Sequence, residues 1–536
     1  MVHRLLLRIE RREQTEQRTM TTYIPHTEDE INMMLTDIGN KSLDDLHTTI
    51  PVEVLLEEGL GLPPGISEAD VVRSIRELAD SNIGGYAGAS RYVNAMLGER
   101  RLRNPYPLNS LVCFAGGGAY DHYVPPVVSS LASKSEFVTS YTPYQAEVSQ
   151  GVLQALFEYQ TMMSRISGLP VANASLYDGA SALYEAVNMA VSYTDRHDIW
   201  ISCGVNPRWR SVLDTLVDGR NIKVHPIKLR DASTDWGISH VSPELSPPAA
   251  IVIAYPNYLG ALENIEQARE LADGLGSLLI VAFNPISMGM LPTPGYYGAD
   301  IAIAEGQPLG IGLSFGGPYL GILSCREEYM RIIPGRVIGE STDNRNRRAY
   351  TMTLRTREQD IRRERATSNV CTNQTLMAIT ATIYLSWLGP AGLKEVSRRC
   401  YSGAHYLHKL LCSIDGVEAL YNEPFFNEFA LKIPVNSEIL LARLADEGFI
   451  GGVALDNELY DELYDDNVSH AMEIANDNSD SSSGHIDNSP ADGKHRSSRT
   501  VEGKSDNGRR LLIAVTEKRT IQDIESYALS FEKALQ

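Results

Sequence analysis

The stretch GADIAIAEGQPLGIGLSFGGPYLG, which covers residues 298–321, decides how the largest part of this chain folds. Alternating isoleucine and alanine over Asp300–Ala304 predict a short buried strand. A glycine-rich loop follows, and Tyr319–Leu323 predicts a second strand. Gln307 and Pro308 stand directly after the first strand, and the sequence contains no lysine between Lys228 and Lys394.

The missing lysine has a chemical consequence. Enzymes that use pyridoxal phosphate on a doubly wound sheet carry, just after such a strand, the lysine that binds the cofactor aldehyde. In this chain Gln307 and Pro308 occupy that place. A chain with this scaffold cannot form the covalent link by itself. The sequence therefore argues against an independent pyridoxal-phosphate decarboxylase or desulfurase.

Strands and helices alternate before this stretch. The expected strands are Val171–Asp178, Ile199–Cys203, Ile222–Ile227, Ala250–Ala254 and Leu278–Phe283, and the helices between them include Arg208–Val217 and Glu263–Gly274. Continuous apolar strands separated by helices predict a doubly wound, mostly parallel sheet with helices on both faces. We therefore expect an α/β fold.

A turn of small residues, Gly179, Ala180 and Ser181, follows the first of these strands and begins a helix. Free N–H groups at the start of a helix favour anions, and folds of this kind hold a cofactor phosphate there. The signal is weak by itself, since most such turns only change the direction of the chain. We interpret this turn as a vestigial phosphate-type turn that is kept for packing.

The length of 536 residues predicts two or three domains. Residues 1–19 form an extension that we expect to be disordered, and residues 20–114 predict a helical arm whose first helix is capped by Thr27. Residues 115–372 form the large α/β domain. Residues 373–536 predict a smaller C-terminal α/β domain, in which the polar segment 465–510 is expected to be a disordered insertion.

Composition limits the partners and the compartment. A net charge of −20 argues against broad binding to nucleic acid or anionic membranes, and we expect no membrane-spanning segment. The six cysteines are scattered, as is typical of reduced thiols in a cytoplasmic protein. His405 and His408 share the spacing of helical metal ligands but lack companions, so we expect surface histidines and no metal site.

Three segments leave alternatives open. The loop YTPYQAEVSQG, residues 141–151, places Tyr141, Tyr144, Gln145 and Glu147 close together, which is dense for a mere connector. These side chains either line a site or pack between the arm and the sheet. The glycines of Ala115–Ala119 either let the backbone approach a ligand or partner, or form a flexible connector. The arginines of residues 336–365 form either a solvated, self-paired surface or a docking surface.

Five motifs together resemble one family, and they occur in the family's order: YIPHT, YTPYQAEVSQG, LYDGASALYEA, EGQPLGIGLSFGGPYLG and TREQDIRRERATSNVCTNQ. The family is the glycine cleavage system P-protein, and the chain resembles its N-terminal half, which many bacteria and archaea make as a separate alpha subunit. The resemblance runs from Met20 to the C-terminus apart from the segment 465–510.

The resemblance implies the fold type I architecture of pyridoxal-phosphate-dependent transferases. It implies the activity of glycine dehydrogenase (aminomethyl-transferring), EC 1.4.4.2. It further implies that pyridoxal phosphate belongs to a partner beta subunit in a heterodimer or an α2β2 tetramer, that glycine is decarboxylated, and that the aminomethyl group passes to the lipoyl arm of H-protein. By the same resemblance, T-protein and L-protein are expected to be functional partners.

The residues of this chain agree with that division of labour. A cofactor-binding chain would place an aspartate near the end of the strand Leu278–Phe283, where this chain has Ala282, Phe283 and Asn284. We expect no catalytic residue in this chain, with Tyr141, Tyr144, Gln145 and Glu147 lining the partner's site across the interface. The alternative is a catalytically silent scaffold or a regulatory pseudo-enzyme of the same fold.

Overall fold

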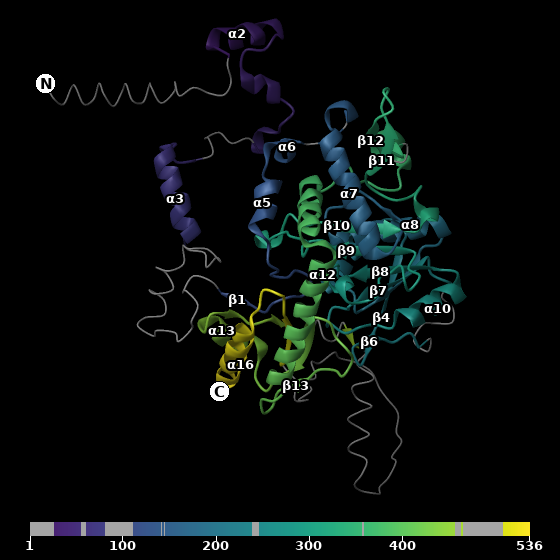
Figure 1. Cartoon of the computed structure of the whole chain (residues 1–536). Coiled ribbons are helices and arrows are strands. Elements are labelled where there is room, and N and C mark those ends of the chain that lie inside the picture. The colour runs from purple at the N-terminus through teal and green to yellow at the C-terminus, as the bar shows by residue number, and fades with distance from the viewer. Residues whose placement is uncertain are drawn as a thin grey trace, which may run out of the picture. The chain divides into compact units, whose positions relative to one another are not determined.

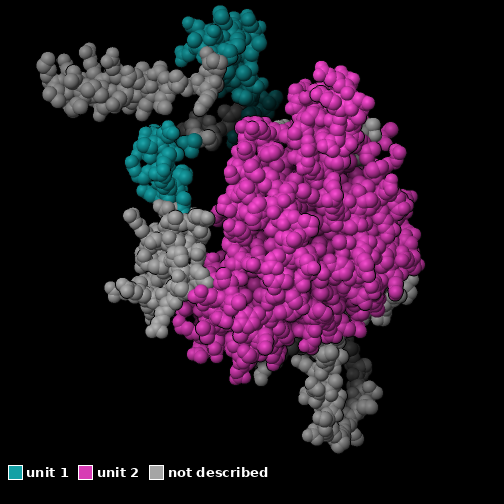
Figure 2. Space-filling model, viewed as in Figure 1, with its two compact units in different colours: residues 1–79 teal, residues 80–536 magenta. Residues whose placement is uncertain are grey.

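The computed structural model describes residues 26–54, 61–80, 111–140, 142–143, 145–237, 246–355, 358–455, 463–464 and 508–536. Residues 1–79 and 80–536 form two compact units, which Figure 2 shows in different colours. The extension 1–19 and most of the insertion 465–510 lie outside the described residues.

Helices make up the described part of the first unit. They are α2 (Glu28–Asp37), the 3-10 helices η2 (Leu43–His47) and η3 (Val52–Val54), and α3 (Glu68–Asp80). The predicted cap is confirmed, because the Thr27 side chain accepts the N–H of Glu30 while the Glu30 carboxylate accepts the N–H of Thr27. Ser67 and Asp70 make a similar pair at the start of α3, since the Asp70 N–H donates to the Ser67 hydroxyl.

A seven-stranded sheet forms the centre of the second unit (Figure 1). Its strands, in spatial order, are β2 (Val171–Ala172), β10 (Gly321–Cys325), β9 (Ile301–Glu305), β8 (Leu278–Phe283), β7 (Ala250–Tyr255), β3 (Asp198–Ser202) and β4 (Lys223–Ile227). The strands from β9 to β4 are parallel, and β10 is antiparallel to both of its neighbours. This confirms the mostly parallel α/β sheet.

Helices cover both faces of this sheet because neighbouring residues of each strand point to opposite sides. On β9, Ala302 and Ala304 pack with α7 (Gln150–Ser167) and the first part of α12 (Thr375–Leu411). Ile301 and Ile303 pack with α8 (Gly179–Thr194) and α9 (Pro207–Val217). The helix α10 (Ile265–Leu275) packs against β7 and β8.

Shorter elements connect these layers. They are β1 (Val112–Cys113), α5 (Pro126–Ala132), α6 (Ser135–Val138), η4 (Ala146–Val148), β5 (Leu229–Arg230), β6 (Ser233–Thr234), η6 (Ser287–Gly289), η7 (Ser314–Gly316), η8 (Glu327–Tyr329), the hairpin of β11 (Val337–Thr342) and β12 (Arg348–Thr353), α11 (Gln359–Arg362) and η10 (Arg363–Arg365).

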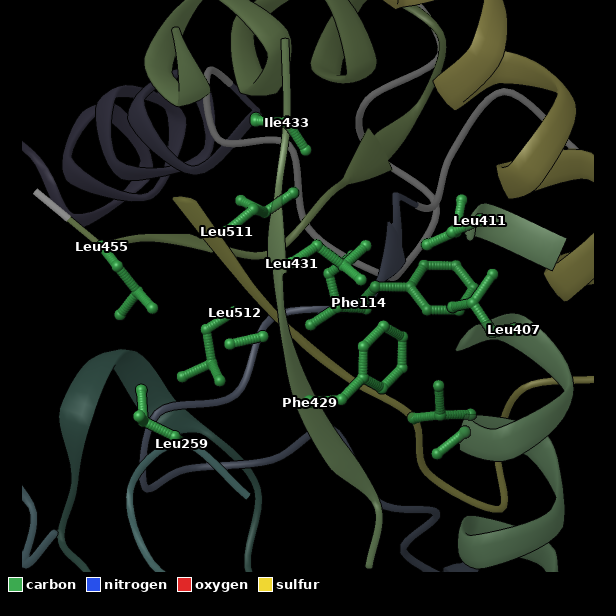
Figure 3. Close-up of a cluster of buried hydrophobic side chains, with 14 of the residues drawn as sticks. Phe114, Leu259, Leu407, Leu411, Phe429, Leu431, Ile433, Leu455, Leu511 and Leu512 are labelled. Carbon is green, nitrogen blue, oxygen red and sulfur yellow. The ribbon is translucent and has the colours of Figure 1, made fainter. Parts of the chain in front are cut away.

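The C-terminal part of the second unit contains a four-stranded antiparallel sheet. Its spatial order is β13 (Glu418–Ala419), β14 (Glu428–Lys432), β17 (Arg510–Ala514) and β16 (Val453–Ala454), and it is accompanied by α13 (Ser437–Asp446), β15 (Phe449–Ile450) and α16 (Ile521–Leu535). Figure 3 shows its core, where Phe114 and Phe429 lie together with Leu407 and Leu411 of α12. Thr520 caps α16, because its hydroxyl accepts the N–H of Asp523, three residues later in the sequence.

The helix α12 belongs to both cores. It bends at Gly389, whose φ is 60°, immediately before Pro390. Tyr384 lies in the core beneath the large sheet, and Leu407 lies in the core of the small sheet. Among the described helices, α12 is long and apolar enough to cross a membrane by length and composition. Because its buried residues fill these two cores, we assign it as a core helix.

Several predicted bounds were wrong. The strand expected at Val171–Asp178 has only two residues, because the Asn173 side chain accepts the N–H of Ser175 and turns the backbone out of the ladder. Arg510 was placed in the insertion, but it begins β17, pairs with Lys432 and is buried. The apolar run Thr375–Leu388, which its composition predicts to be buried, is exposed at Trp387, whose side chain is 55% exposed.

Candidate active-site cleft

A cleft of about 80 Å³ lies at the carboxyl ends of the parallel strands. Ala254 and Ala282 are the next-to-last residues of β7 and β8, Glu305 ends β9, and all three line the cleft. Tyr120 comes from the glycine-rich segment after β1, and Glu428 comes from the start of β14. Open α/β sheets bind their ligands at this edge, so this cleft is where a cofactor site of the fold would lie.

Gln307 is buried beside the cleft with 1% of its surface exposed. Its side-chain oxygen accepts the N–H of Tyr120 at 2.9 Å, and its side-chain nitrogen donates to the carbonyls of Tyr120 at 3.0 Å and Ile311 at 2.8 Å. Gln307, which stands where the lysine would be expected, thus acts as a structural bracket: its side chain connects the segment of Tyr120 to the loop of Ile311. Pro308 follows it and lines the cleft.

Glu305 places a carboxylate where a bound anion would be expected. It is 8% exposed, and it accepts the backbone N–H groups of Gly179 at 3.0 Å, Gln307 at 2.9 Å and Leu320 at 3.1 Å. Burial raises the pKa of Glu305 to about 7, against the effect of these hydrogen bonds. The first N–H of α8 is therefore already occupied by a side chain of the protein.

The turn Gly179, Ala180 and Ser181 is closed from the other side as well. Asp178 caps α8 by accepting the N–H of Ser181 at 2.7 Å. A Cβ atom on Gly179 would lie 2.1 Å from the ring of Trp209, which also lines the cleft. Glycine is required at 179 because the indole packs directly against the backbone there.

A second buried carboxylate, Glu428, faces the cleft from the small sheet. It is 3% exposed and accepts the N–H of Gly117 at 2.6 Å and the hydroxyl of Tyr120 at 2.9 Å. Burial raises the pKa of Glu428 to about 7. A Cβ on Gly116 would lie 2.1 Å from this carboxylate, so the glycines allow close packing of the segment rather than serving as a loose connector.

The residues present do not fit pyridoxal phosphate. Gln307 replaces the lysine, and Ala282, Phe283 and Asn284 stand where an aspartate would face the pyridine nitrogen. Among the described residues that line the cleft there is no lysine, arginine or histidine. At the phosphate-type turn, Glu305 accepts the N–H of Gly179 and Trp209 packs against the Gly179 backbone.

The predicted interface loop lies elsewhere. Tyr141 and Tyr144 are outside the described residues. Gln145 and Glu147 are exposed at η4, and neither lines the cleft. Gln150, at the start of α7, holds this region to β12, because its side-chain amide makes hydrogen bonds with both the N–H and the carbonyl of Tyr350. The structure thus brings Gln307, Pro308 and the 179–181 turn together, whereas the described Gln145 and Glu147 do not line this cleft.

The expectation of surface histidines was wrong in one respect. His405 is only partly exposed, stacks on Phe425 with ring centroids 4.0 Å apart, and lies at 3.1 Å from the Phe425 carbonyl. His408 contacts the same ring. Burial lowers the pKa of both imidazoles. The apolar face of α12 in this region accommodates the rings, which explains a spacing that looked like a ligand pair.

Another buried cluster joins three elements. Glu517 accepts the N–H of Tyr123 at 2.8 Å and lies 2.6 Å from Nδ1 of His122 and 3.5 Å from Sγ of Cys400. All three side chains offer metal-ligand atoms within 4.8 Å of one another. The 2.6 Å separation is a hydrogen-bond distance. We therefore assign a buried His–Glu pair that fastens the segment before α5 to the loop before α16.

The arginine-rich segment contains one buried arginine and several exposed arginines that pair with nearby acids, as expected for a solvated, self-paired surface. Arg336 is buried and donates to the carbonyl of Cys371 at 2.9 Å. Arg347 pairs with Asp343 at 2.8 Å, and Arg355 pairs with Asp360 at 3.0 Å. These pairs are largely exposed to solvent, so they contribute little to stability.

Sequence reasoning missed the residues that close the cleft: Glu305, Glu428, Trp209 and Tyr120. A signal existed for Glu305, since it is an acid at the end of an otherwise apolar strand and directly precedes Gly306. Glu428 and Trp209 come from segments far away in the sequence. No local pattern indicates that they meet at this cleft.

Comparison with known proteins places these features in a family. The model of the glycine cleavage system P-protein family matches residues 106–468. The chain is 42% identical over 443 residues to a probable glycine dehydrogenase (decarboxylating) subunit 1 from Moorella thermoacetica, covering 82% of this chain and 93% of the relative. A protein with the same description from Prosthecochloris aestuarii is 42% identical over 436 residues, covering 81% and 92%.

Solved structures agree with this assignment. The crystal structure of a glycine decarboxylase (P-protein) of the glycine cleavage system, in inhibitor-bound form, matches with a TM-score of 0.74 and 36% identity, covering 96% of this chain and 100% of that one. An alanine–glyoxylate aminotransferase from Nostoc matches with a TM-score of 0.51 at 15% identity, covering 82% and 99%, which shows the shared fold alone. The expected fold type I architecture is confirmed.

Proposed function

This chain belongs to the glycine cleavage system P-protein family, and on that premise we propose that it is the alpha subunit of a heteromeric P-protein. Together with a beta subunit it decarboxylates glycine and transfers the aminomethyl group to the lipoyl arm of H-protein. This is the activity of glycine dehydrogenase (aminomethyl-transferring), EC 1.4.4.2. T-protein and L-protein act with it, and the complex is cytoplasmic.

The occupied phosphate-type turn and the missing lysine are the observations that support this division of labour. Gln307 brackets two loops, and Glu305 with Trp209 occupies the turn where the fold would hold a phosphate. The names of the relatives describe a subunit 1, which implies a further subunit in those proteins. We assign pyridoxal phosphate, whose ring is an electron sink for decarboxylation, to the beta subunit.

The proposed contribution of this chain is a surface that completes the beta subunit's site. Gln145 and Glu147 are exposed at η4 and held in place through Gln150 and α7. We propose that they, with Tyr141 and Tyr144, line the entrance used by glycine and the lipoyl arm. Polar side chains on a braced turn can orient a small polar substrate without binding the cofactor.

The first experiment separates the subunits. Each subunit is purified alone and together, and glycine–bicarbonate exchange is measured with pyridoxal phosphate and H-protein. We expect exchange only from the mixture. Borohydride reduction of this chain with the cofactor should leave no phosphopyridoxyl-lysine. Stoichiometric modification of a lysine here, or exchange by this chain alone, would overturn the proposal.

A second experiment tests the surface and the scaffold alternative. In the co-expressed complex, the double variant Gln145→Ala and Glu147→Ala should lower exchange roughly tenfold, about 1.4 kcal/mol of barrier, with normal assembly. The matched control is Gln154→Ala, an exposed glutamine of α7. Unchanged exchange would leave no role for this turn, and full exchange by the beta subunit alone would favour the silent scaffold.

A further inference from the structure

We propose that Phe315, at the tip of the loop after the cleft, is an anchor that inserts into an apolar pocket of the beta subunit. The inference rests on the proposed function, because it names the subunit that receives the ring. It concerns a different part of the chain from the cleft and from the 141–147 loop. Phe315 belongs to η7 (Ser314–Gly316).

The Phe315 side chain is fully exposed. Its relative exposure is 101%, higher than that of every other large hydrophobic residue among the described residues. A phenyl ring that leaves its whole surface in water forgoes the stabilisation that burial would give it. Single exposed apolar residues are common on protein surfaces, so exposure alone does not indicate a contact.

The backbone supplies the second, independent observation. Ser314 has a φ of 45°, and Phe315 has a φ of 55° with a ψ of 29°. Both are left-handed, a conformation that residues with a side chain adopt at an energetic cost, and a bulky aromatic residue is rare there. Strained residues of this kind persist where the surrounding structure holds them, and they concentrate at functional contacts.

Hydrogen bonds hold the loop in this conformation. The Tyr319 hydroxyl donates to the Leu313 carbonyl at 3.1 Å, and the Gly316 N–H donates to the same carbonyl at 2.9 Å. The Gly317 N–H donates to the Ser314 carbonyl at 3.3 Å. At the base of the loop, Gln307 donates to the Ile311 carbonyl at 2.8 Å. The ring is therefore presented on a fixed support, which lowers the entropy lost on docking.

The chemistry of the loop indicates the kind of pocket that fits it. No charged residue occurs from Gly306 to Cys325, although the chain as a whole has a net charge of −20. The tip offers a phenyl ring, the partly exposed Leu313 and glycine backbone. Burying such a tip strands no charge, so it suits an apolar pocket with hydrogen-bonding groups at its rim. Two copies of this acidic chain would repel one another, which favours a different chain as the partner.

The experiment measures binding and stability separately. The dissociation constant between this chain and the beta subunit is measured by calorimetry for wild type, Phe315→Ala and Phe315→Gly, and the melting temperature of each isolated chain is recorded. We expect both variants to weaken binding at least tenfold, about 1.4 kcal/mol. The isolated Phe315→Gly chain should melt at or above the wild-type temperature, since glycine accepts a positive φ.

Matched controls keep the result specific. Tyr296→Ala removes another exposed aromatic side chain, 74% exposed and free of left-handed backbone, and should leave binding unchanged. Phe315→Leu should restore much of the affinity, because it keeps an apolar side chain. Loss of affinity in proportion to a lower melting temperature would show a structural role and overturn the docking.

Other outcomes also decide the question. An unchanged dissociation constant for Phe315→Ala in a complex that forms normally overturns the anchor and leaves the proposed function intact. Absence of any complex with the wild-type chain overturns both. If sedimentation shows that the isolated chain is a dimer and Phe315→Ala makes it a monomer, the ring binds a second copy of this chain, and the assignment to the beta subunit is wrong.

Discussion

Gln307 and Phe315 follow the same strand, yet the first is 1% exposed and the second 101%. Gln307 makes its side-chain hydrogen bonds inside the protein, across the end of the cleft. The Phe315 side chain is not buried in the interior, and its backbone has a left-handed conformation. The comparison shows that this segment is closed where the fold binds a cofactor and open beside it. The chain keeps the architecture of a cofactor site, but the side chain that it exposes beside this site is the ring of Phe315.

The largest expected effect tests the closed half of this comparison. Gln307→Ala removes the partners of the Tyr120 N–H and carbonyl, which are not replaced by alanine. We expect the free energy of unfolding to fall by about 3 kcal/mol, because buried polar groups without partners cost about 1–3 kcal/mol each. Urea denaturation of the isolated chain measures it. Gln267→Ala, an exposed glutamine of α10, is the control, and a loss below about 1 kcal/mol for Gln307→Ala would contradict the bracket.

A smaller effect is expected from the turn at the start of α8. Gly179→Ala places a methyl group 2.1 Å from the Trp209 ring and should cost about 2 kcal/mol through overpacking. Gly151→Ala in α7 meets no atom within 4 Å and should be neutral or stabilise the chain by about 0.5–1 kcal/mol. Thermal unfolding of both variants compares Gly179, which packs against a ring, with Gly151, which has space for a side chain. Equal melting temperatures would mean that Trp209 moves aside without cost.

The smallest effect concerns pH. Burial raises the pKa of Glu428 to about 7 in the folded chain, above its ordinary value of 4.5. The folded state then binds more protons than the unfolded state between these values, so this group's contribution to stability is present below about pH 4.5 and is lost as pH rises towards 7. Glu428→Gln lacks this titration.

The measurement for Glu428 is a difference. The free energy of unfolding of wild type minus that of Glu428→Gln should decline between pH 5 and pH 8 by about 1 kcal/mol or more. Taking the difference removes the pH dependence that the two proteins share. A difference that stays constant, or that rises with pH, would show that the carboxylate is not held in its neutral form by burial.

The parallel sheet was predictable because its strands are continuous apolar runs such as Leu278–Phe283, whose predicted and observed bounds coincide. The caps at Thr27 and Thr520 were predictable because capping depends on residues three positions apart. The segment after Ala172 was misread as strand, since hydrogen bonds of Asn173 and Ser175 compete with the ladder. A local sequence pattern does not show that a side chain will form such a hydrogen bond with the backbone and replace the hydrogen bonds of the strand.

The cleft was predictable only in part. The absence of a lysine is visible in the sequence, and it identifies Gln307 and Pro308 as the altered position. The use of Glu305 as an internal hydrogen-bond acceptor depends on the approach of α8 to the end of β9, and Glu428 accepts the N–H of Gly117 from more than 300 positions away in the sequence. The exposed position of Phe315 depends on φ angles, which a string of residue types does not contain.

The helix α12 has a consequence for the order in which the chain can fold. Ile379 and Tyr384 complete the core beneath the large sheet, while Leu407 and Leu411 complete the core of the small one. The strands of the large sheet all leave the ribosome before α12 does, so the part of the α7 face that α12 covers stays exposed until residue 385 has emerged. The hydrogen bond of Phe114 forms later still, because the Phe114 carbonyl accepts the N–H of Ala514, which is near the end of the chain. A nascent chain of this protein therefore exposes part of its two cores until α12 and then β17 have emerged, which is the interval in which a chaperone would bind it.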